Sequence, residues 1–266
     1  MFNILKARFL QGHRTMDYPQ GPPPPMPERF RGRPVIDAAK CPPGCQVCAE
    51  ACPVDAIIFV GINPQIDLGR CLFCTDCMDA CPAGAITYSP DYRLSTRNRE
   101  DLKVGPDVEL KLAKALDEKL LRLFGRSLKL RQVSAGGCNA CEADVNVLGT
   151  VGWDLGRFGI QMVASPRHAD GLLITGCVTE NMKLAVEKAY AAVAPPKIVI
   201  AVGACAISGG PFLKNPQQLG GAGSTVPVDL YIPGCPPHPL TILDGLLRVL
   251  DRLEDSDKNK INVIKN

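Results

Sequence analysis

The sequence is poor in aromatic residues, in net charge and in long apolar runs. Only 5% of its 266 residues are Phe, Trp or Tyr, and 30 Lys and Arg against 27 Asp and Glu leave a formal net charge of +3. No uninterrupted apolar stretch approaches the roughly 18 residues of a membrane-spanning helix, since the best candidate, 197–207, follows two prolines and runs into two glycines. We therefore expect a chain that does not cross a membrane and that forms two modest domains.

We expect neither a secretory signal nor a disulfide framework. Lys6, Arg8 and Arg14 interrupt the N-terminus before an apolar signal region can develop, and thirteen cysteines is an odd number. Residues 1–40 carry seven Lys or Arg against three Asp or Glu, with apolar side chains among them. This end either docks on a membrane subunit or an anionic surface, or is a solvated arm that wraps its own domain.

Cysteine, proline and glycine are what the chain has in excess. The proline-rich stretch 21–34 predicts an extended strap, so that residues 1–40 form an extended N-terminal arm. Residues 41–104 then contain an internal repeat, in which each half is a cysteine loop, a short helix, a Cys-Pro pair and a small apolar strand. This pattern predicts a small α+β domain.

The spacing of the repeated cysteines is typical of two-cluster ferredoxins. There, three ligands of a 4Fe-4S cluster come from a C-x2-C-x2-C loop, and the fourth cysteine, followed by Pro, ligates the other cluster. We assign the two clusters to two crossed quartets, Cys41, Cys45, Cys48 and Cys81, and Cys71, Cys74, Cys77 and Cys52.

The first loop departs from this spacing by one residue. "CPPGC" must bulge to keep Cys41 in reach, and Gly44 can supply the backbone freedom, whereas loss of this ligand leaves a three-iron cluster. Zinc is the alternative interpretation of C-x2-C pairs, but zinc takes four ligands per ion and no Cys-Pro crossover.

A helical linker is expected at 105–125. Apolar residues recur with helical spacing between 107 and 124, and Gly125 closes the run. Residues 105–117 would span about 40 Å when extended but about 20 Å as a helix, so we expect the helix to keep the clusters in electron-transfer range.

Residues 126–255 alternate short apolar strands with helices, followed by a polar tail at 256–266. Strands are expected at 128–134, 160–165, 171–176, 197–203 and 228–234, and helices near 180–193 and 239–253. This order predicts an α/β domain with a mainly parallel open sheet.

Five cysteines follow these strands, and loops at the carboxyl ends of parallel strands converge on one crevice. They are Cys138, Cys141, Cys177, Cys205 and Cys235. By spacing alone, four of them either form a third cluster or are buried and inert, and Cys177, which has no quartet to join, is interpreted as a core residue.

Four motifs occur in order, "GGCNACE", "SPRHAD", "GACAISGG" and "VPVDLYIPGCPPHP". They resemble the small electron-transfer subunit of group 4 membrane-bound nickel-iron hydrogenases, which include formate hydrogenlyase and energy-converting hydrogenases. The same subunit occurs in complex I, where it is the B-type subunit. The resemblance covers about 118–255 and implies a flavodoxin-like sheet. The first 104 residues resemble the two-cluster ferredoxin subunit of the same complexes, so that two subunits look fused.

The resemblance implies that Cys138, Cys141, Cys205 and Cys235 hold a third 4Fe-4S cluster nearest the catalytic subunit. The complex I protein carries two adjacent cysteines at the first position, whereas Cys138-Asn-Ala-Cys141 is the hydrogenase-type spacing. Three further residues are candidates. Glu142 either relays protons or caps a helix, and Arg167 and His168 either tune a potential or carry a proton, or lie at a subunit interface.

The function implied is an electron relay without a catalytic residue of its own. It connects an electron donor or acceptor, ferredoxin or a dehydrogenase, to a nickel-iron large-subunit-like chain, in a complex with membrane subunits at the cytoplasmic face of the cell membrane. The alternative is a component of a complex I-like quinone-reducing complex without hydrogen chemistry. Nucleic acid is not an expected partner.

Overall fold

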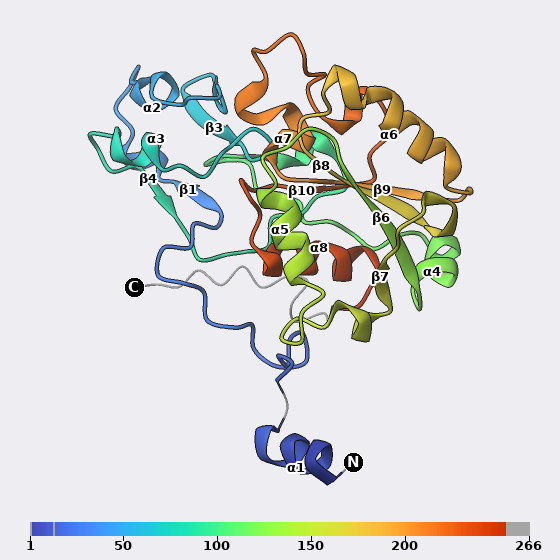
Figure 1. Cartoon of the computed structure of the whole chain (residues 1–266). Coiled ribbons are helices and arrows are strands. Elements are labelled where there is room, and N and C mark those ends of the chain that lie inside the picture. The colour runs from blue at the N-terminus through green and yellow to red at the C-terminus, as the bar shows by residue number, and fades with distance from the viewer. Residues whose placement is uncertain (1, 13, 254–266) are drawn as a thin grey trace.

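The computed structural model describes residues 2–12 and 14–253 and contains one large and two small sheets (Figure 1). The large sheet has five strands, β6 Leu128–Ser134, β7 Ile160–Met162, β8 Gly171–Thr175, β9 Ile198–Val202 and β10 Leu230–Ile232. The helices of this half are α4 Glu118–Phe124, α5 Ala140–Val147, α6 Glu180–Ala192, α7 Ala204–Ser208 and α8 Pro239–Val249. Short 3-10 turns lie at Leu155–Phe158, Pro166–His168, Gly210–Phe212 and Ala222–Ser224.

The large sheet is entirely parallel, in the order β10-β9-β8-β6-β7. Counted along the chain this is the order 2-1-3-4-5 of flavodoxin-like sheets, which confirms the expected fold class. β8 and β9 are buried at all five positions, as apolar strands covered on both faces must be. The strand order reverses between β6 and β8, so a crevice is expected at the carboxyl ends of these two strands.

The two faces of this sheet pack against different layers. On one face, α5 and α8 bury Val145, Leu148 and the apolar side of α8 against Leu173 and Ile200. On the other face, α6, α7 and the N-terminal iron-sulfur region share one continuous hydrophobic cluster.

The N-terminal region, residues 34–104, is the ferredoxin-like part. Its strands are β1 Pro34–Ile36, β2 Ile57–Val60, β3 Asn63–Asp67, β4 Ile86–Tyr88 and β5 Lys103–Val104. β1 pairs with β4, and β3 lies between β2 and β5, all antiparallel. The helices α2 Val47–Glu50 and α3 Asp76–Asp79 each follow a cysteine loop, and 3-10 turns lie at Ala38–Lys40 and Arg99–Leu102. The expected cysteine loop, short helix and strand thus occur twice.

The expectation of a helix over 105–125 was wrong for most of that range. The helix α4 is limited to Glu118–Phe124 because Asp117 caps it, its side chain accepting a hydrogen bond from the Leu120 amide at 3.0 Å. Residues 105–108 form a turn, and 109–117 have no regular secondary structure. The amides of Ala113 and Leu116 donate hydrogen bonds to the carbonyls of Ser95 and Val249. The apolar side chains that suggested a helical period therefore pack from this irregular segment against both halves of the molecule.

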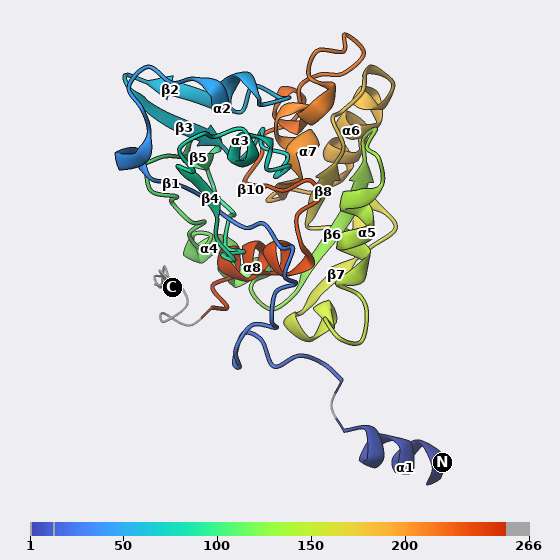
Figure 2. The ribbon, with the colours of Figure 1, turned by 90° about the vertical axis from the view of Figure 1, so that its left-hand side faces the viewer.

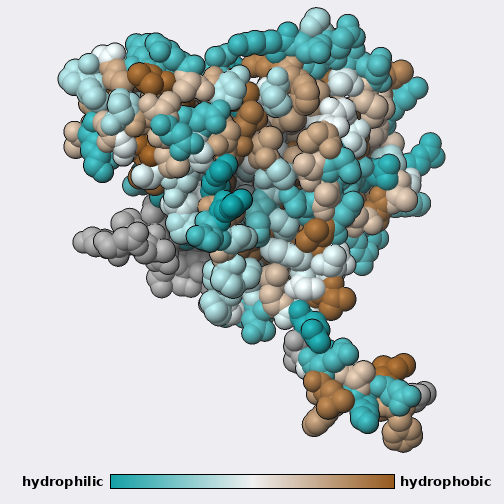
Figure 3. All heavy atoms as spheres, turned by 60° about the vertical axis from the view of Figure 1, so that its left-hand side comes forward, coloured by the Kyte–Doolittle hydropathy of each residue, from teal (hydrophilic) through white to brown (hydrophobic). Residues whose placement is uncertain are grey.

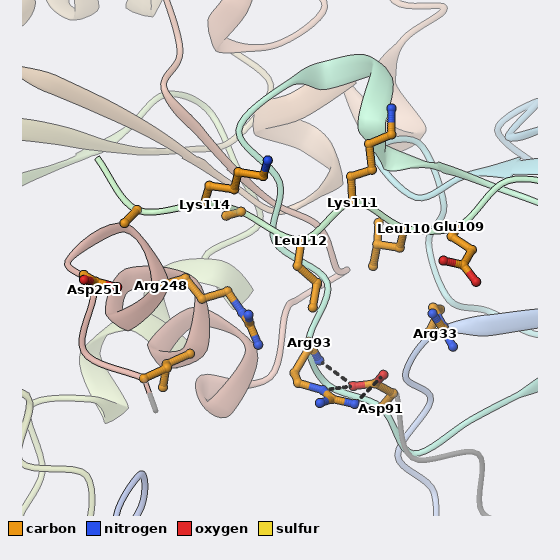
Figure 4. Close-up of a pocket in the computed structure, with 13 residues that line it drawn as sticks. Arg33, Asp91, Arg93, Glu109, Leu110, Lys111, Leu112, Lys114, Arg248 and Asp251 are labelled. Carbon is orange, nitrogen blue, oxygen red and sulfur yellow. Dashed lines mark hydrogen bonds and ion pairs between the residues drawn. The ribbon is translucent and has the colours of Figure 1, made fainter. Parts of the chain in front are cut away.

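This irregular segment borders a cavity of about 640 Å³ next to α8. Figure 4 shows Glu109, Lys111, Leu112 and Lys114 along it. The Leu112 side chain points toward Arg93, which forms an ion pair with Asp91 at 2.8 Å, whereas the two lysine side chains point away from this pair. The cavity lining carries charges of both signs and includes no cysteine among the described residues. We assign it no part in cluster binding.

An extended N-terminal arm was expected for residues 1–40, but the arm is not extended throughout. Residues Phe2–Gln11 form the helix α1, which contains no proline or glycine and ends at Gly12, where φ is +61°. None of its residues is buried, and it stands away from the rest of the molecule (Figure 2), with hydrophobic side chains on its surface (Figure 3). Residues 34–40, the other end of the expected arm, belong to the ferredoxin-like part through β1.

The predicted strap, 21–34, has no regular secondary structure up to residue 33, and neither do residues 14–20 before it. We refer to residues 14–33 together as the strap, and it wraps its own chain. Arg157 donates hydrogen bonds to the carbonyls of Met16 and Tyr18, at 2.5 and 2.6 Å. The buried Tyr18 hydroxyl reaches Asp244 of α8, which forms a buried ion pair with Arg248 at 2.7 Å. The strap is therefore attached to the C-terminal domain.

The two halves are joined by direct contacts. Thr96 and Tyr231 exchange two backbone hydrogen bonds, 3.0 and 2.9 Å, which extends the edge of the large sheet at β10. Ser208 of α7 donates to the carbonyl of Gly69 at 2.9 Å. Among the described residues, no helix has the length and apolar character needed to span a membrane. The expected polar tail, 256–266, lies outside the described residues.

Candidate iron-sulfur cluster sites

The first quartet surrounds one cavity. Its lining is apolar apart from four thiols, those of Cys41, Cys45, Cys48 and Cys81. Burial raises the pKa of Cys41, and the nearby thiols of Cys45 and Cys81 raise it further. Cys81 belongs to the second loop in sequence but lies with the first loop in space, as the crossed assignment requires. Gly44 adopts φ +75°, so the extra residue of the "CPPGC" loop is taken up by a left-handed glycine.

The second quartet shows the complementary crossover. Burial raises the pKa of Cys77, and Cys52, from the first loop, and Cys74 raise it further. Burial also raises the pKa of Cys71, to about 12. Phe73 and Thr75 flank Cys74 with positive φ values of 54° and 76°, an uncommon conformation for residues with a side chain, which turns this loop tightly.

Backbone amides point at the sulfurs of both quartets. The amides of Ala56, Phe73 and Ala85 donate to the sulfurs of Cys52, Cys71 and Cys81 at 3.2, 3.3 and 3.3 Å. Such hydrogen bonds stabilise negative charge on a ligating sulfur and so tune a bound cluster.

Tyr88 is a further residue of the second site, which the sequence did not single out. Its hydroxyl lies 4.0 Å from the Cys71 sulfur and 3.7 Å from that of Cys77. Burial and then these two sulfurs raise the pKa of Tyr88, so the phenol stays protonated and able to donate to a thiolate. The sequence signal was a polar aromatic residue in the small strand after the second Cys-Pro pair.

The third group of cysteines lies at the carboxyl ends of the parallel strands. Cys138 and Cys141 follow β6, Cys205 is in α7 after β9, and Cys235 follows β10. Burial raises the pKa of Cys205 to about 12, and Cys235, Cys177 and Cys138 raise it further. Burial likewise raises the pKa of Cys141. The negative charges nearby raise this pKa further, in the order Cys205, Glu142, Cys235 and Cys138. Residues almost a hundred positions apart therefore share one electrostatic environment.

Two positions lie so close to these sulfurs that they have no space for a Cβ atom. A Cβ on Gly203, which has φ +90°, would lie 2.5 Å from the Cys141 sulfur, and a Cβ on Gly210 would lie 2.9 Å from that of Cys205. Contacts under 3.0 Å are essentially never made by a real Cβ. Only glycine fits at these two positions, which the sequence showed as glycines near Cys205 but could not relate to individual sulfurs.

These residues fit the requirements of 4Fe-4S clusters. All thirteen thiols are free. Within the described part of the chain, no group of three or more His, Cys, Asp or Glu side chains is arranged to hold a single metal ion. A cubane cluster instead takes four thiolates spread around a larger core. Quartets of thiols with apolar walls and with backbone amides directed at sulfur fit such a core.

Glu142 lies at the switch point of the sheet. It is buried in the first turn of α5, and its Oε1 accepts hydrogen bonds from Ser134 of β6 at 2.6 Å and Thr175 of β8 at 2.7 Å. Burial alone would raise the pKa of Glu142, but these hydrogen bonds outweigh it and lower the pKa. The carboxylate therefore stays ionised where the two strands separate, and no side-chain capping bond is made at Asn139.

The other candidates lie elsewhere. Arg167 and His168 are exposed in the 3-10 turn that leads into the amino end of β8, one strand length from the cysteine loops, and the structure does not bring them to the thiols. Cys177 is buried next to the third group, and its thiol donates to the carbonyl of Gly136 at 3.3 Å. His238 accepts a hydrogen bond from the Leu240 amide at 3.1 Å and so caps α8.

Comparison with known proteins agrees with this division of the chain. Residues 138–249 match the family described as NADH ubiquinone oxidoreductase, 20 Kd subunit, and residues 33–82 match the 4Fe-4S dicluster domain. The probable membrane-bound hydrogenase subunit mbhJ of Pyrococcus furiosus is 39% identical over 143 residues, 54% of this chain and 86% of that protein.

Two other relatives represent both branches of the resemblance. Formate hydrogenlyase subunit 7 of Escherichia coli is 41% identical over 60% of this chain and 63% of its own length. The B-type component of the NADH-quinone oxidoreductase of Phocaeicola vulgatus is 42% identical over 47% of this chain and 64% of its own length. The chain thus spans less than two thirds of these two proteins.

Four motifs in order, a flavodoxin-like sheet with cysteines at its strand ends, and these identities all lead to one assignment. The chain belongs to the family of the 20 kDa subunit of NADH ubiquinone oxidoreductase and its hydrogenase-complex relatives, with a two-cluster 4Fe-4S ferredoxin domain joined to its N-terminus.

Proposed function

We propose that this chain relays electrons through three 4Fe-4S clusters between an electron donor or acceptor and the nickel-iron catalytic subunit of a membrane-associated hydrogenase complex. The two crossed quartets hold the first two clusters, and Cys138, Cys141, Cys205 and Cys235 hold the third. The supporting observation is the arrangement of these groups in space. One thiol of the second quartet lies near the third group, because Cys74 raises the pKa of Cys235, after burial and Cys138. The Leu72–Phe73 loop and Cys235 also line one cavity.

A bound 4Fe-4S cluster supplies one-electron transfer. The residues of this chain determine where and at what potential that transfer takes place. Backbone amides and Tyr88 stabilise negative charge on the sulfurs, whereas the apolar walls disfavour it. The shared hydrophobic core keeps the ferredoxin-like part against the C-terminal domain, so that the groups stay at fixed separations.

The partners and the location of the complex are part of the same proposal. Relatives named as a membrane-bound hydrogenase subunit and a formate hydrogenlyase subunit support a nickel-iron large-subunit-like chain and membrane subunits as neighbours. We place the protein at the cytoplasmic face of the cell membrane, with ferredoxin or a dehydrogenase as electron donor. The exposed Cys138 and Cys235 mark the side of the third group that a catalytic subunit can approach.

Iron counting tests the cluster assignment. The anaerobically purified complex should contain about twelve irons in this chain, and Cys235→Ser should remove about four of them together with one electron paramagnetic resonance (EPR) signal. Cys177→Ser is the matched control, because Ser can keep the hydrogen bond to Gly136, and its iron content should not change. About eight irons in the unmodified protein, or equal losses in both variants, would contradict the proposal.

A second candidate is a component of a quinone-reducing complex without hydrogen chemistry. It is supported by the 42% identity to the NADH-quinone oxidoreductase relative. The hydrogenase-type spacing of Cys138 and Cys141 favours the first candidate. The two are separated by assaying the purified complex for hydrogen evolution and for quinone reduction, and by examining the adjacent large subunit for two C-x2-C pairs that can ligate nickel.

A further inference from the structure

The strap connects the second and third cluster sites. Arg31 donates hydrogen bonds to the carbonyls of Phe73 and Cys74, at 3.1 and 3.3 Å. These carbonyls belong to the tightly turned loop of the second quartet. One residue earlier, Phe30 packs edge-on against His238, with ring centroids 5.4 Å apart. His238 is the N-cap of α8 and lies three residues after Cys235. Two adjacent strap residues thus contact the loops of two different cluster sites.

This part of the strap is held firmly beyond Arg31. The Gly32 amide donates to the carbonyl of Ser89 at 2.9 Å, and the Arg33 amide to that of Asp91 at 3.0 Å. A Cβ on Gly32 would lie 2.2 Å from the Asp91 carbonyl oxygen, so the backbone approaches too closely for any other residue. The guanidinium of Arg31 is therefore directed at the Cys74 loop by a fixed backbone.

A cavity of about 270 Å³ lies between the strap and both loops. Its lining includes Arg31 from the strap, Leu72 and Phe73 from the second site, and Gly234 and Cys235 from the third site. The strap, the Cys74 loop and the Cys235 loop consequently meet at one place, although they are separated by about 40 and 160 positions in sequence.

We propose that Arg31 is a positioning residue of the electron path, which holds the Cys74 loop beside the Cys235 loop and favours the reduced state of the cluster bound by the Cys74 loop. This inference rests on the proposed function. Reduction adds negative charge to a cluster, and a guanidinium on the carbonyls of its ligand loop stabilises that charge. Because Arg31 is exposed, solvent and salt screen the interaction, so the effect on the potential is moderate.

The test is a redox titration of the purified complex, followed by EPR, on Arg31→Gln and Arg31→Lys. The signal of the second cluster is identified as the one changed by Cys74→Ser. Arg31→Gln should lower the equilibrium constant for reduction of that cluster roughly threefold, which the relation of about 59 mV per tenfold change converts to about 28 mV. Arg31→Lys keeps the charge and should keep most of the potential.

Arg29→Gln is the control, because it removes one positive charge from the same strap at a residue that lines the same cavity. Among the described residues, Arg29 makes no hydrogen bond to the Cys74 loop, so its variant should shift the potential less. Equal shifts in the Gln variants at 29 and 31, or no shift in either, would overturn the inference. Iron content separates it from the proposed function, since fewer than about twelve irons in the unmodified protein would contradict the proposed function itself.

Discussion

Replacing Gly203 by Ala is the sharpest test of the third cluster site. Gly203 has φ 90° and ψ 156°, a backbone conformation essentially restricted to glycine, and placing another residue there costs about 1–3 kcal/mol. The added Cβ would also lie 2.5 Å from the Cys141 sulfur. Overpacking of this kind lowers the stability of the folded state by about 1–3 kcal/mol more, so the total loss of stability is about 2–6 kcal/mol.

The structure localises this strain. The methyl group would press against a sulfur of the third group, with Gly234 and Pro237 as the next neighbours, at 3.5 and 3.8 Å. The three atoms nearest to the added Cβ all belong to the C-terminal domain, so the first two clusters should remain. We therefore expect Gly203→Ala to contain about eight irons instead of about twelve, and to lose one EPR signal while the other two persist.

Gly223→Ala is the matched control. An added Cβ at Gly223 meets nothing within 4 Å, and its φ lies outside the strained range. Both variants should be purified anaerobically, and their iron content, EPR spectra and melting temperature compared. If Gly203→Ala kept its full iron content and all three signals, the inference that the third cluster depends on the Cys141 sulfur packed against Gly203 would be refuted.

Two further perturbations test other parts of the structure. Burial lowers the pKa of His238, and its neutral ring accepts the hydrogen bond from the Leu240 amide. The stability contributed by this cap is therefore complete above the ordinary histidine pKa of 6.5, and it falls as the pH drops below that value. His238→Asn should keep a cap and flatten the dependence of melting temperature on pH between about 7.5 and 5.5, whereas a slope equal to that of the unmodified protein would show that another group titrates. Ser208→Ala removes the buried hydrogen bond to Gly69 and should destabilise the contact between the two halves by about 1 kcal/mol. Amide hydrogen exchange should then be faster on both sides of this contact. Faster exchange on one side alone would contradict this interpretation.

The C-terminal fold was predictable because its pattern is local. The strands β8 and β9 are short runs buried at every position, and the parallel order follows from the alternation of strands with helices. The cysteine spacing was equally informative, since one crossed pair of loops fixes two quartets. The cysteines at the strand ends were a weaker signal, because only the strand order brings Cys141, Cys205 and Cys235 together.

The segment before α4 could not be predicted correctly from a single helical period. Leu112 and Leu116 satisfy that period, yet in the structure Leu112 packs against one hydrophobic cluster and Leu116 belongs to the other. The choice between a helix and an irregular segment depends on hydrogen bonds to Ser95 and Val249, which are distant in sequence. Arg31 and Tyr88 were missed for the same reason, since their partners lie 42 and at most 17 positions away and no spacing rule relates them.

The irregular segment also changes the physical role of the connection between the two halves. A helix was expected to set the distance between cluster sites, but the distance is set by the shared hydrophobic cluster, the Thr96–Tyr231 bridge and the Ser208–Gly69 hydrogen bond. The connection is itself part of this contact, because Ala113 and Leu116 are buried and their amides donate hydrogen bonds to the carbonyls of Ser95 and Val249. Under the proposed function, we therefore expect electron transfer between the second and third sites to depend on the surface contact and the strap across it. Residues at that contact, more than the length of the connection, should determine the rate of this transfer.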